Sequence, residues 1–346
     1  MPNSHLEREI YEQPETLARL LAEEQGHAAD LAGLIRDFDP AFVHIAARGT
    51  SDNAARYAQY ALGIEAGLPV ALAAPSIHTL YEAQPRLGRA LVIGISQSGR
   101  SEDVRRVVAD GRAQGALTIS ITNAPDSPIA QAAEHHIWLR CGEEQAVAAT
   151  KTYTAQLLAG AMLVGALVGD EDKLATLQNV PLWMHDTLME AKGIADWVER
   201  YRYASQFAVL GRGYNYCTAF EIGLKIKEMN GLVCEQYSEA DFRHGPIAMV
   251  QPGFPVIVVA PGGKPQPLLI DLLDKLRERG AERIVITDDP DLKAAEQRAL
   301  LPSGIPEWLS PICAIAPGQV FAMQLARTKG LPLDQPIGLT KVTITR

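Results

Sequence analysis

The sequence predicts an α/β fold with two parallel sheets, each flanked by helices in a doubly wound, flavodoxin-like arrangement. Short apolar runs alternate with segments of helical periodicity along most of the 346 residues, a pattern typical of parallel sheets. Small polar loops follow several of the apolar runs, at the end of the strand where such sheets bind ligands. The pattern starts again near residue 201. We therefore interpret the chain as two α/β units related by a weak internal repeat.

The amino-acid composition limits the kinds of molecule that the protein is expected to bind. Hydrophobic residues make up 47% of the chain, enough for two cores, and the formal net charge is −9. Because the lysines and arginines are scattered, nucleic acid and anionic membranes are not expected as partners. Residues 1–15 contain no apolar h-region, and no later run of about 20 apolar residues is free of charge and glycine. We expect a cytoplasmic protein that takes an anionic ligand only at a local site.

The cysteines predict neither a disulfide framework nor a zinc site. No CxxC pair is present, and no histidine stands at metal-binding spacing from a cysteine. The four residues lie far apart in the sequence, at Cys141, Cys217, Cys234 and Cys313.

The first predicted domain covers residues 37–172 and follows an arm and helix at residues 1–36, where Pro14 is acceptable in a first helical turn. Its strands end in polar loops that we expect at one edge of the sheet. The predicted strands are residues 42–46, 92–95, 117–121 and 136–139, and the helices include residues 54–62 and 149–168.

The loop after the second of these strands is the most informative stretch. Three hydroxyls and one amide crowd around Gly99 where a helix begins; they belong to Ser96, Gln97, Ser98 and Ser101. Such groups, with free N–H groups and the helix dipole, can hold a phosphate. The alternative is a polar turn in which Ser101 only caps the helix, and the pattern alone favours neither. The stretch lacks the Gly-Lys-Ser/Thr of a P-loop and the second glycine of a nucleophile elbow.

A helical connector at residues 173–200 leads to the second predicted domain at residues 201–330. Its predicted strands are residues 207–210, 256–260 and 283–286, and its helices are residues 214–229 and 268–279. No second Ser-rich loop follows these strands, so we expect one phosphate site per chain. Tyr216 replaces the third glycine of a dinucleotide fingerprint after Gly211 and Gly213, which disfavours a nicotinamide cofactor.

One stripe of the helix at residues 214–229 carries Thr218, Glu221, Lys225 and Glu228. Spacing alone favours a solvated face with ion pairs worth about 0.2–0.5 kcal/mol each. Carboxylates beside an ammonium are also candidates for acid–base chemistry. His244 lies in a His-Gly-Pro loop, and Lys341 lies in a Pro/Gly-rich tail at residues 331–346. Each is either a surface residue or, for the histidine, a proton shuttle near neutral pH.

Together these motifs resemble tandem sugar isomerase (SIS) domain proteins, and among them the isomerase half of glucosamine-6-phosphate synthases (glutamine:fructose-6-phosphate aminotransferases). The resemblance extends from Glu9 to Lys341 and implies two SIS domains. The motifs that carry it, in order, are residues 9–14, Gly49-Thr50-Ser51, Ser96-Gln97-Ser98-Gly99, Ala149-Thr150-Lys151, Leu210-Gly211-Arg212-Gly213, residues 221–228, His244-Gly245-Pro246 and Asp334-Gln335-Pro336.

The resemblance implies a role for each candidate residue. A sugar phosphate is expected on Ser96, Gln97, Ser98 and Ser101, with Thr50, Ser51 and the Val147 region around the sugar. Glu228 is expected to move the proton between C1 and C2, with help from Lys225 and Glu221. His244 is expected to assist ring opening in the neighbouring subunit of a homodimer, and Lys341 matches the lysine that forms a Schiff base with the ketose.

Several positions depart from the synthase pattern. Ser101 replaces a threonine but keeps the hydroxyl, Arg48 replaces a cysteine, and Arg100 replaces a glutamate. Ile337-Gly338 replaces an Arg-Asn pair that helps couple the sugar site to a glutaminase domain. The chain also starts at the isomerase arm, so we expect no glutaminase domain.

We therefore predict a glucosamine-6-phosphate deaminase that gives fructose-6-phosphate and ammonia without a metal or redox cofactor. The alternatives are an ammonia-dependent enzyme of the synthase type, and a deaminase or deglycase of galactosamine-6-phosphate or fructosamine-6-phosphate. A further alternative is a non-catalytic phosphosugar sensor. Retention of Glu228, His244 and Lys341 argues against the sensor, because phosphate binding requires none of them.

Overall fold

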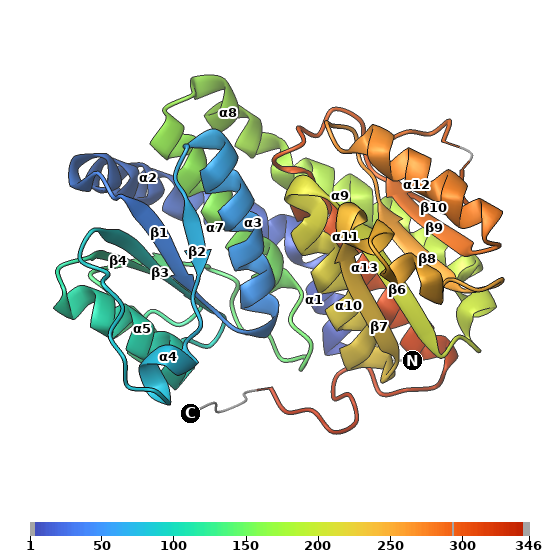
Figure 1. Cartoon of the computed structure of the whole chain (residues 1–346), viewed down its shortest axis with the longest axis horizontal. Coiled ribbons are helices and arrows are strands. Elements are labelled where there is room, and N and C mark those ends of the chain that lie inside the picture. Colours follow the sequence, from blue (N-terminus) through green and yellow to red (C-terminus); the bar gives the residue numbers. More distant parts are fainter. Residues whose placement is uncertain (1–3, 293, 342–346) are drawn as a thin grey trace. The chain divides into compact units, whose positions relative to one another are not determined.

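The structure is a computed structural model that describes residues 4–292 and 294–341 (Figure 1). The chain divides into two compact units, each with its own parallel sheet. Sheet unit 1 comprises Glu15–Glu144, Lys151–Asn179 and Thr340–Arg346, and sheet unit 2 comprises Met1–Pro14, Gln145–Thr150 and Val180–Leu339. The predicted domain boundaries at residues 36, 172, 200 and 330 stay predictions, and residues 342–346 of the predicted tail lie outside the described residues.

Sheet unit 1 contains a five-stranded parallel sheet with the strand order β2-β1-β3-β4-β5. Every residue of the central strand β3 and of its neighbour β4 is buried, as expected for a sheet covered on both faces. The strands are β1 (Phe42–Ala46), β2 (Val70–Leu72), β3 (Ala90–Ser96), β4 (Leu117–Thr122) and β5 (His135–Trp138).

A mostly buried helix of sheet unit 1 is α7 (Lys151–Val168). Its length and hydropathy would suit a membrane span, but 89% of it is buried inside the protein, as in a core helix. It packs along α3 (Gly49–Glu65), while α5 (Glu102–Ala113) packs on β3. The remaining helices are α2 (Gln13–Phe38), α4 (Ser76–Thr79), α6 (Pro128–Ala132), α8 (Glu171–Thr176) and the short 3-10 helix η1 (Leu177–Asn179).

Sheet unit 2 repeats the same topology. Its five parallel strands have the order β10-β9-β8-β6-β7, which in chain order within the unit is again second, first, third, fourth, fifth. This is the flavodoxin-like order, so the predicted fold class and the internal repeat are confirmed. The strands are β6 (Gln206–Gly211), β7 (Val233–Ser238), β8 (Pro255–Val259), β9 (Glu282–Thr287) and β10 (Gln297–Leu300).

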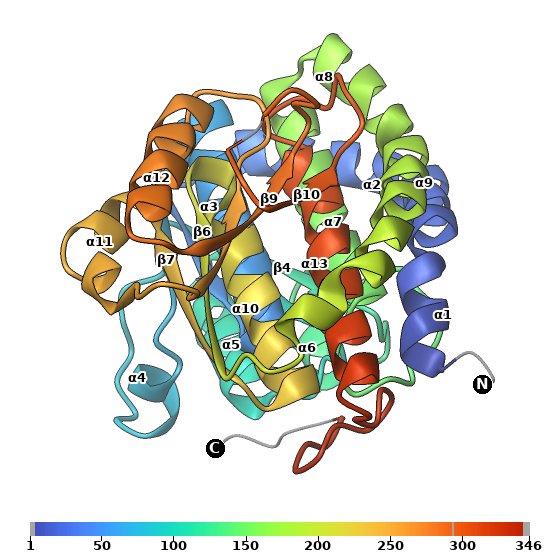
Figure 2. The same ribbon diagram turned by 90° about the vertical axis from the view of Figure 1, so that its right-hand side faces the viewer.

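Two helices of sheet unit 2 pack side by side, α10 (Tyr216–Asn230) and α13 (Ser310–Thr328) (Figure 2). A Cβ atom on Gly318 of α13 would lie 2.3 Å from Ile222 of α10, so the two helices approach closely only because this residue is glycine. The Asn230 side chain donates a hydrogen bond to the carbonyl of Ala322 at 3.0 Å, which joins the same pair. The remaining helices are α1 (His5–Tyr11), α9 (Val180–Ala191), α11 (Glu239–Arg243), α12 (Gln266–Glu278) and the 3-10 helices η2 (Lys192–Asp196), η3 (Val198–Tyr201), η4 (Gly213–Asn215) and η5 (Pro246–Met249).

Candidate active site

The predicted phosphate loop lies between β3 and α5 in sheet unit 1. Gly99 has a φ of 65°, and a Cβ atom at this position would lie 2.0 Å from the hydroxyl oxygen of Ser127. The loop backbone is therefore available only to glycine here. The N–H of Gly99 donates a hydrogen bond to the hydroxyl oxygen of Ser96 at 3.1 Å, which tightens the turn. The loop leads directly into the first turn of α5, where backbone N–H groups lack intrahelical partners.

Ser101 occupies the N-cap position of α5, but its side chain makes no capping hydrogen bond. The simple capping interpretation is therefore wrong for this hydroxyl. Ser98 is half-buried, and its hydroxyl oxygen accepts a long hydrogen bond of 3.4 Å from the N–H of Arg100. Gln97 is half-buried as well. These hydroxyl and amide groups can donate to an anion without placing a full charge beside it.

A second loop lies at the same edge of the sheet. Strand β1 is hydrogen-bonded to β3, with Ala46 opposite Gly94, so the loops after both strands leave the sheet side by side. Thr50 and Ser51 lie in the first turn of α3, directly after β1. The hydroxyl oxygen of the buried Ser51 accepts a hydrogen bond from Gln156 of α7 at 3.0 Å. The structure thus gathers all six predicted phosphate- and sugar-binding residues of sheet unit 1 at one edge.

An ion pair that we did not predict connects these two loops. The guanidinium of Arg48 donates to the carboxylate of Asp103 at 2.7 Å, and the Asp103 side chain is only 1% exposed. Arg48 thereby neutralises a carboxylate that would otherwise repel an anion at the start of α5. The sequence showed Arg48 in the polar loop after one strand and Asp103 in the first turn of the helix after another. Their pairing across 55 residues could not be predicted from it.

Lys341 also belongs to sheet unit 1. Its ammonium donates to the carboxylate of Glu144 at 3.1 Å, and its side chain is 26% exposed. The Glu144 side chain is fully buried and accepts from the hydroxyl of Thr152 at 2.8 Å and from the N–H of Thr152 at 3.2 Å. Lys341 is thus held by a buried carboxylate at the start of α7, a contact that no motif in the sequence predicts.

In sheet unit 2, the predicted charged stripe of α10 forms a row of three side chains. The ammonium of Lys225 lies 3.3 Å from Glu221 and 2.5 Å from Glu228. Glu221 and Lys225 are fully buried, so the solvated-face interpretation of this stripe is wrong for them. The reason is that α10 packs against β6, β7 and α13, which enclose it.

The electrostatics of the row follow from this burial. Burial alone lowers the pKa of Lys225, but the carboxylates of Glu221 and Glu228 outweigh it and hold this pKa above its ordinary value. Lys225 is therefore a fixed cation. Glu228 differs from its neighbours because its side chain is 24% exposed while it is paired with Lys225.

The accessible carboxylate borders a cavity of about 260 Å³ at the C-terminal end of α10. Its walls are mainly apolar and come from the end of α10 and the chain after α13. The lining residues are Lys227, Glu228, Met229, Asn230, Gly231, Leu331, Pro332, Pro336, Ile337 and Leu339. Ile337, which departs from the synthase pattern, is 82% exposed.

His244 is exposed and follows α11 directly. The helix is anchored by Glu239, whose carboxylate pairs with Arg212 and Arg243. Gly245 has a φ of 142°, which turns the chain immediately after the histidine. Within residues 4–292 and 294–341, no hydrogen bond or ion pair joins the His244 ring to the row on α10. The structure therefore does not bring His244 and Glu228 into contact.

Val147 lies where three predicted motifs meet in sheet unit 2. Its N–H donates to the carbonyl of Asp334 at 3.0 Å, and the Asp334 carboxylate accepts from the N–H of Leu6 at 2.9 Å. The Glu9 carboxylate accepts from the N–H groups of Gln145 and Ala146. The arm, the segment around Val147 and the start of the tail are thus interlocked.

Comparison with known proteins identifies this arrangement. Residues 42–166 and 201–327 each match the SIS domain. The chain belongs to the SIS domain family. Each match spans one of the two sheets, which confirms the tandem arrangement.

Relatives of this SIS protein include a glutamine–fructose-6-phosphate aminotransferase [isomerizing] of Thermus thermophilus. It is 31% identical over an alignment of 349 positions, which covers 96% of this chain and 58% of the relative. The chain thus spans little more than half the length of that protein. The C-terminal domain of glucosamine-fructose-6-phosphate aminotransferase from Francisella tularensis superposes with a TM-score of 0.87 at 25% identity, covering 96% of this chain and 98% of that one. The recognised resemblance to the isomerase half of the synthases is confirmed.

A crystal structure of a candidate phosphosugar isomerase from Silicibacter pomeroyi DSS-3 is similar over nearly the whole length of this chain. Its TM-score is 0.87 at 33% identity, and the match covers 96% of this chain and 99% of that one.

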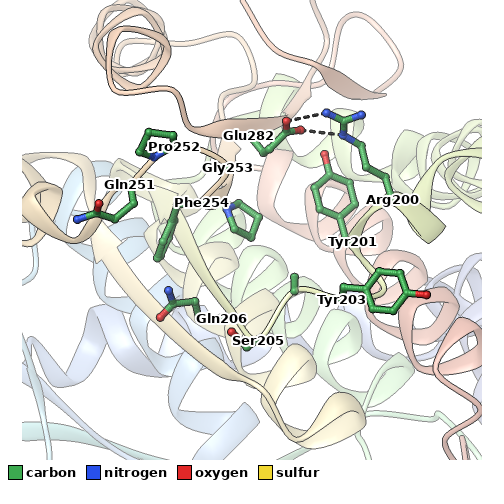
Figure 3. Close-up of a pocket in the computed structure, with 12 residues that line it drawn as sticks. Arg200, Tyr201, Tyr203, Ser205, Gln206, Gln251, Pro252, Gly253, Phe254 and Glu282 are labelled. Atoms are coloured by element: carbon green, nitrogen blue, oxygen red, sulfur yellow. Dashed lines mark hydrogen bonds and ion pairs between the residues drawn. The ribbon is translucent and has the colours of Figure 1, made fainter.

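A larger cavity of about 470 Å³ in sheet unit 2 is not part of the candidate site. It lies where β6, β8 and β9 begin, at the edge of the sheet opposite to the carboxyl ends of these strands. Its charged groups neutralise each other, because Arg200 makes two hydrogen bonds to Glu282, of 2.6 and 2.8 Å (Figure 3).

The four cysteines are all buried and free. Burial raises the pKa of Cys234 and of Cys313 to about 12, which keeps these thiols protonated and unreactive. Within the described part of the chain, no group of three or more His, Cys, Asp or Glu side chains could hold a metal ion.

Proposed function

We propose that this SIS protein is an amino sugar phosphate deaminase and isomerase that converts glucosamine-6-phosphate and water to fructose-6-phosphate and ammonia. In the open-chain sugar, a base removes the proton from C2 and returns it to C1. The amine at C2 loses a proton and becomes an imine, while O1 gains a proton, so that the aldehyde becomes a hydroxymethyl group. Water then hydrolyses the imine to a ketone and releases ammonia. These steps are proton transfers and a hydrolysis, and they require no redox cofactor.

The observation that carries the proposal is the position of Glu228. A base for a C2 proton needs a carboxylate that the substrate can reach and a fixed neighbour that holds it in position. Glu228 has both, since it is partly exposed and lies 2.5 Å from the buried ammonium of Lys225. Glu221 supports the same ammonium from the other side at 3.3 Å. A protein that only binds a phosphosugar does not need such a row.

Binding of the 6-phosphate is assigned to the two loops of sheet unit 1. Ser96, Gln97, Ser98 and Ser101 supply hydroxyl and amide donors, and Gly99 allows the backbone to approach the anion. Thr50 and Ser51 are assigned to the sugar, as is the segment around Val147. Arg48 screens Asp103 from the phosphate.

Two further residues have assigned roles. His244 assists ring opening, and we propose that it serves the neighbouring subunit of a homodimer. Its exposure on the surface of sheet unit 2 is compatible with such a role. Lys341 stabilises or captures the C2 carbonyl or imine.

Mass action supports the deaminating direction. A catalyst speeds the forward and reverse steps equally, and water is present at a far higher concentration than ammonia. The names of relatives such as the Thermus enzyme refer to fructose-6-phosphate and to isomerisation, which supports the same ketose phosphate here. They also favour a second candidate, the reverse reaction with free ammonia as nitrogen donor.

The test is an ammonia-release assay on glucosamine-6-phosphate, galactosamine-6-phosphate and a fructosamine-6-phosphate. Fructose-6-phosphate with ammonium serves as the reverse reaction. We expect release from glucosamine-6-phosphate to be fastest. If ammonia is released only from another sugar phosphate of the panel, that compound is the substrate instead. If the protein binds the phosphosugars but turns none of them over, it is a sensor and not an enzyme.

A further inference from the structure

The contact between Lys341 and Glu144 in sheet unit 1 has a chemical consequence. A lysine attacks a carbonyl only as the neutral amine, whereas an ammonium has no lone pair. Lys341 is within 3.1 Å of the Glu144 carboxylate, which is the geometry of an ammonium held by its counter-ion. A lysine in this state must lose a proton before it can react.

Glu144 is built to receive that proton. Its side chain is fully buried, and its carboxylate accepts the hydrogen bond from the Lys341 ammonium at 3.1 Å. One carboxylate oxygen accepts from the N–H of Thr152, and the other accepts from the Thr152 hydroxyl and from Lys341. The second oxygen therefore faces the amine while the first is fixed to the backbone of α7.

We infer that Glu144 is the proton acceptor that converts Lys341 into a nucleophile, and that Thr152 is the positioning residue for Glu144. The inference rests on the proposed function, because it specifies how Lys341 acts on the ketose phosphate. It assigns Lys341 a covalent role.

The step balances in atoms and charge. The ammonium of Lys341 gives a proton to Glu144, and the neutral amine forms a bond to C2 as the carbonyl electrons move to oxygen. A proton shifts from nitrogen to that oxygen, which gives a carbinolamine. Glu144 then returns its proton to the hydroxyl, which leaves as water, and the nitrogen lone pair forms the iminium. An ammonium and a ketone have become an iminium and water, and Glu144 is again a carboxylate.

A structural alternative explains Glu144 more simply. Its carboxylate satisfies the N–H of Thr152 in the first turn of α7, as a helix cap does. On that interpretation the contact with Lys341 adds nothing to reactivity. The two interpretations differ in one property, namely how the reactivity of Lys341 depends on pH once the carboxylate is replaced by an amide.

The experiment traps the adduct of the full chain with fructose-6-phosphate by cyanoborohydride between pH 6 and pH 10, and quantifies it at Lys341 by peptide mass spectrometry. For the wild type we expect an adduct near neutral pH. For Glu144→Gln we expect the initial trapping rate to fall at least about tenfold near pH 7. The rate then rises with pH toward that of the wild type near pH 10, because bulk base replaces the lost acceptor as lysine deprotonates.

Glu143→Gln is the matched control, because it removes the neighbouring exposed carboxylate, and it keeps the wild-type profile. Glu144→Asp retains a carboxylate and is used if the Gln variant melts below the assay temperature; we expect a reduced rate with the wild-type pH dependence. The inference is overturned if Glu144→Gln traps at the wild-type rate near pH 7. It is equally overturned if its loss is the same at every pH, or if the wild type forms no adduct on Lys341.

These outcomes are separate from those of the ammonia-release assay. A Glu144-dependent adduct on Lys341 in a protein that releases ammonia from no hexosamine phosphate would end the deaminase proposal and leave the role of Glu144 standing. Ammonia release without an adduct on Lys341 would support the deaminase proposal and end the role of Glu144.

Discussion

Glu221, Lys225 and Glu228 are three charged residues on one helix, but they differ in what they can do. The ammonium of Lys225 is enclosed between the two carboxylates, so it is a fixed charge rather than an acid that exchanges protons with solvent. Only Glu228 combines that neighbour with access, at 24% exposure. Glu228 is therefore the proposed base, and its replacement is expected to lower the rate of proton transfer.

Glu228→Gln is expected to lower kcat about 10²–10⁴-fold, the usual contribution of a general acid or base, because an amide cannot accept the C2 proton. KM is expected to change little. Steady-state ammonia release measures both constants, and Glu278→Gln on the exposed end of α12 is the control that keeps the wild-type rate. An unchanged kcat in Glu228→Gln would remove this residue from the role.

Ser98→Ala is expected to raise KM for glucosamine-6-phosphate several-fold, and non-phosphorylated glucosamine is expected to be a poor substrate. The reason is that binding energy at the phosphate orients the distant reacting end of the sugar. The two substrates are compared by kcat/KM in the wild type and the variant. Equal turnover of glucosamine and its 6-phosphate would contradict the assignment of the loop.

Lys341→Ala is expected to slow ammonia release while leaving sugar phosphate affinity within a few-fold of the wild type. The lysine acts at C2 rather than at the phosphate, and removal of the residues 335–346 is expected to slow release further. Isothermal titration with fructose-6-phosphate and the ammonia assay separate binding from turnover. Loss of binding in the point variant would place Lys341 among the phosphate ligands instead.

Among the elements, the loop from β3 to α5 depends on one backbone conformation. Gly99→Ala is expected to lower the free energy of unfolding by at least about 2 kcal/mol, which combines positive φ with a clash against Ser127. Gly169→Ala is the matched control, since it has a φ of 71° and nothing within 4 Å of the added Cβ. We expect about 1–2 kcal/mol there. Urea denaturation measures both, and equal losses would show that the contact with Ser127 is easily relieved.

Elements with a strong local pattern could be predicted from the sequence. Strands such as β3 and β8 are continuous apolar runs, and the structure places them within one or two residues of the prediction. The prediction missed β2, β7 and β10, because β2 has only three residues and the burial of β7 and β10 is incomplete. It also missed α13, which is apolar on all sides and contains Pro317 within the helix, so it shows neither amphipathic periodicity nor an ordinary helix composition.

The same limit applies to the candidate site. The hydroxyl loop could be identified because its residues are adjacent in the sequence. Glu144 could not be connected with Lys341, because 197 residues separate them and no local spacing encodes the contact. The burial of Glu221 and Lys225 could not be predicted for a related reason. It depends on the unpredicted helix α13 and on strands distant in the chain.

For the whole molecule, the proposed homodimer makes a quantitative prediction. If His244 serves the neighbouring subunit, mixing Glu228→Gln subunits with His244→Asn subunits restores about a quarter of the wild-type activity, although each variant alone is inactive. Half of the randomly assembled dimers are then mixed, and each contains one complete pair. Refolding or subunit exchange followed by the ammonia assay provides the measurement. Activity that stays at the level of the separate variants would place His244 and Glu228 in the same chain's reaction.

The interlocked segments of sheet unit 2 also bear on how the protein is made. Leu6 and Asp334 are hydrogen-bonded although 328 residues separate them, and Glu9 is held by the backbone of Gln145 and Ala146. The ribosome synthesises Leu6 long before Asp334. Helix α1 therefore cannot form its contact with Asp334 during nearly all of translation. Sheet unit 1 has all five of its strands by Trp138, and it can assemble its sheet while the rest is still being synthesised. The arm that opens the chain is thus among the last parts to reach its native contacts.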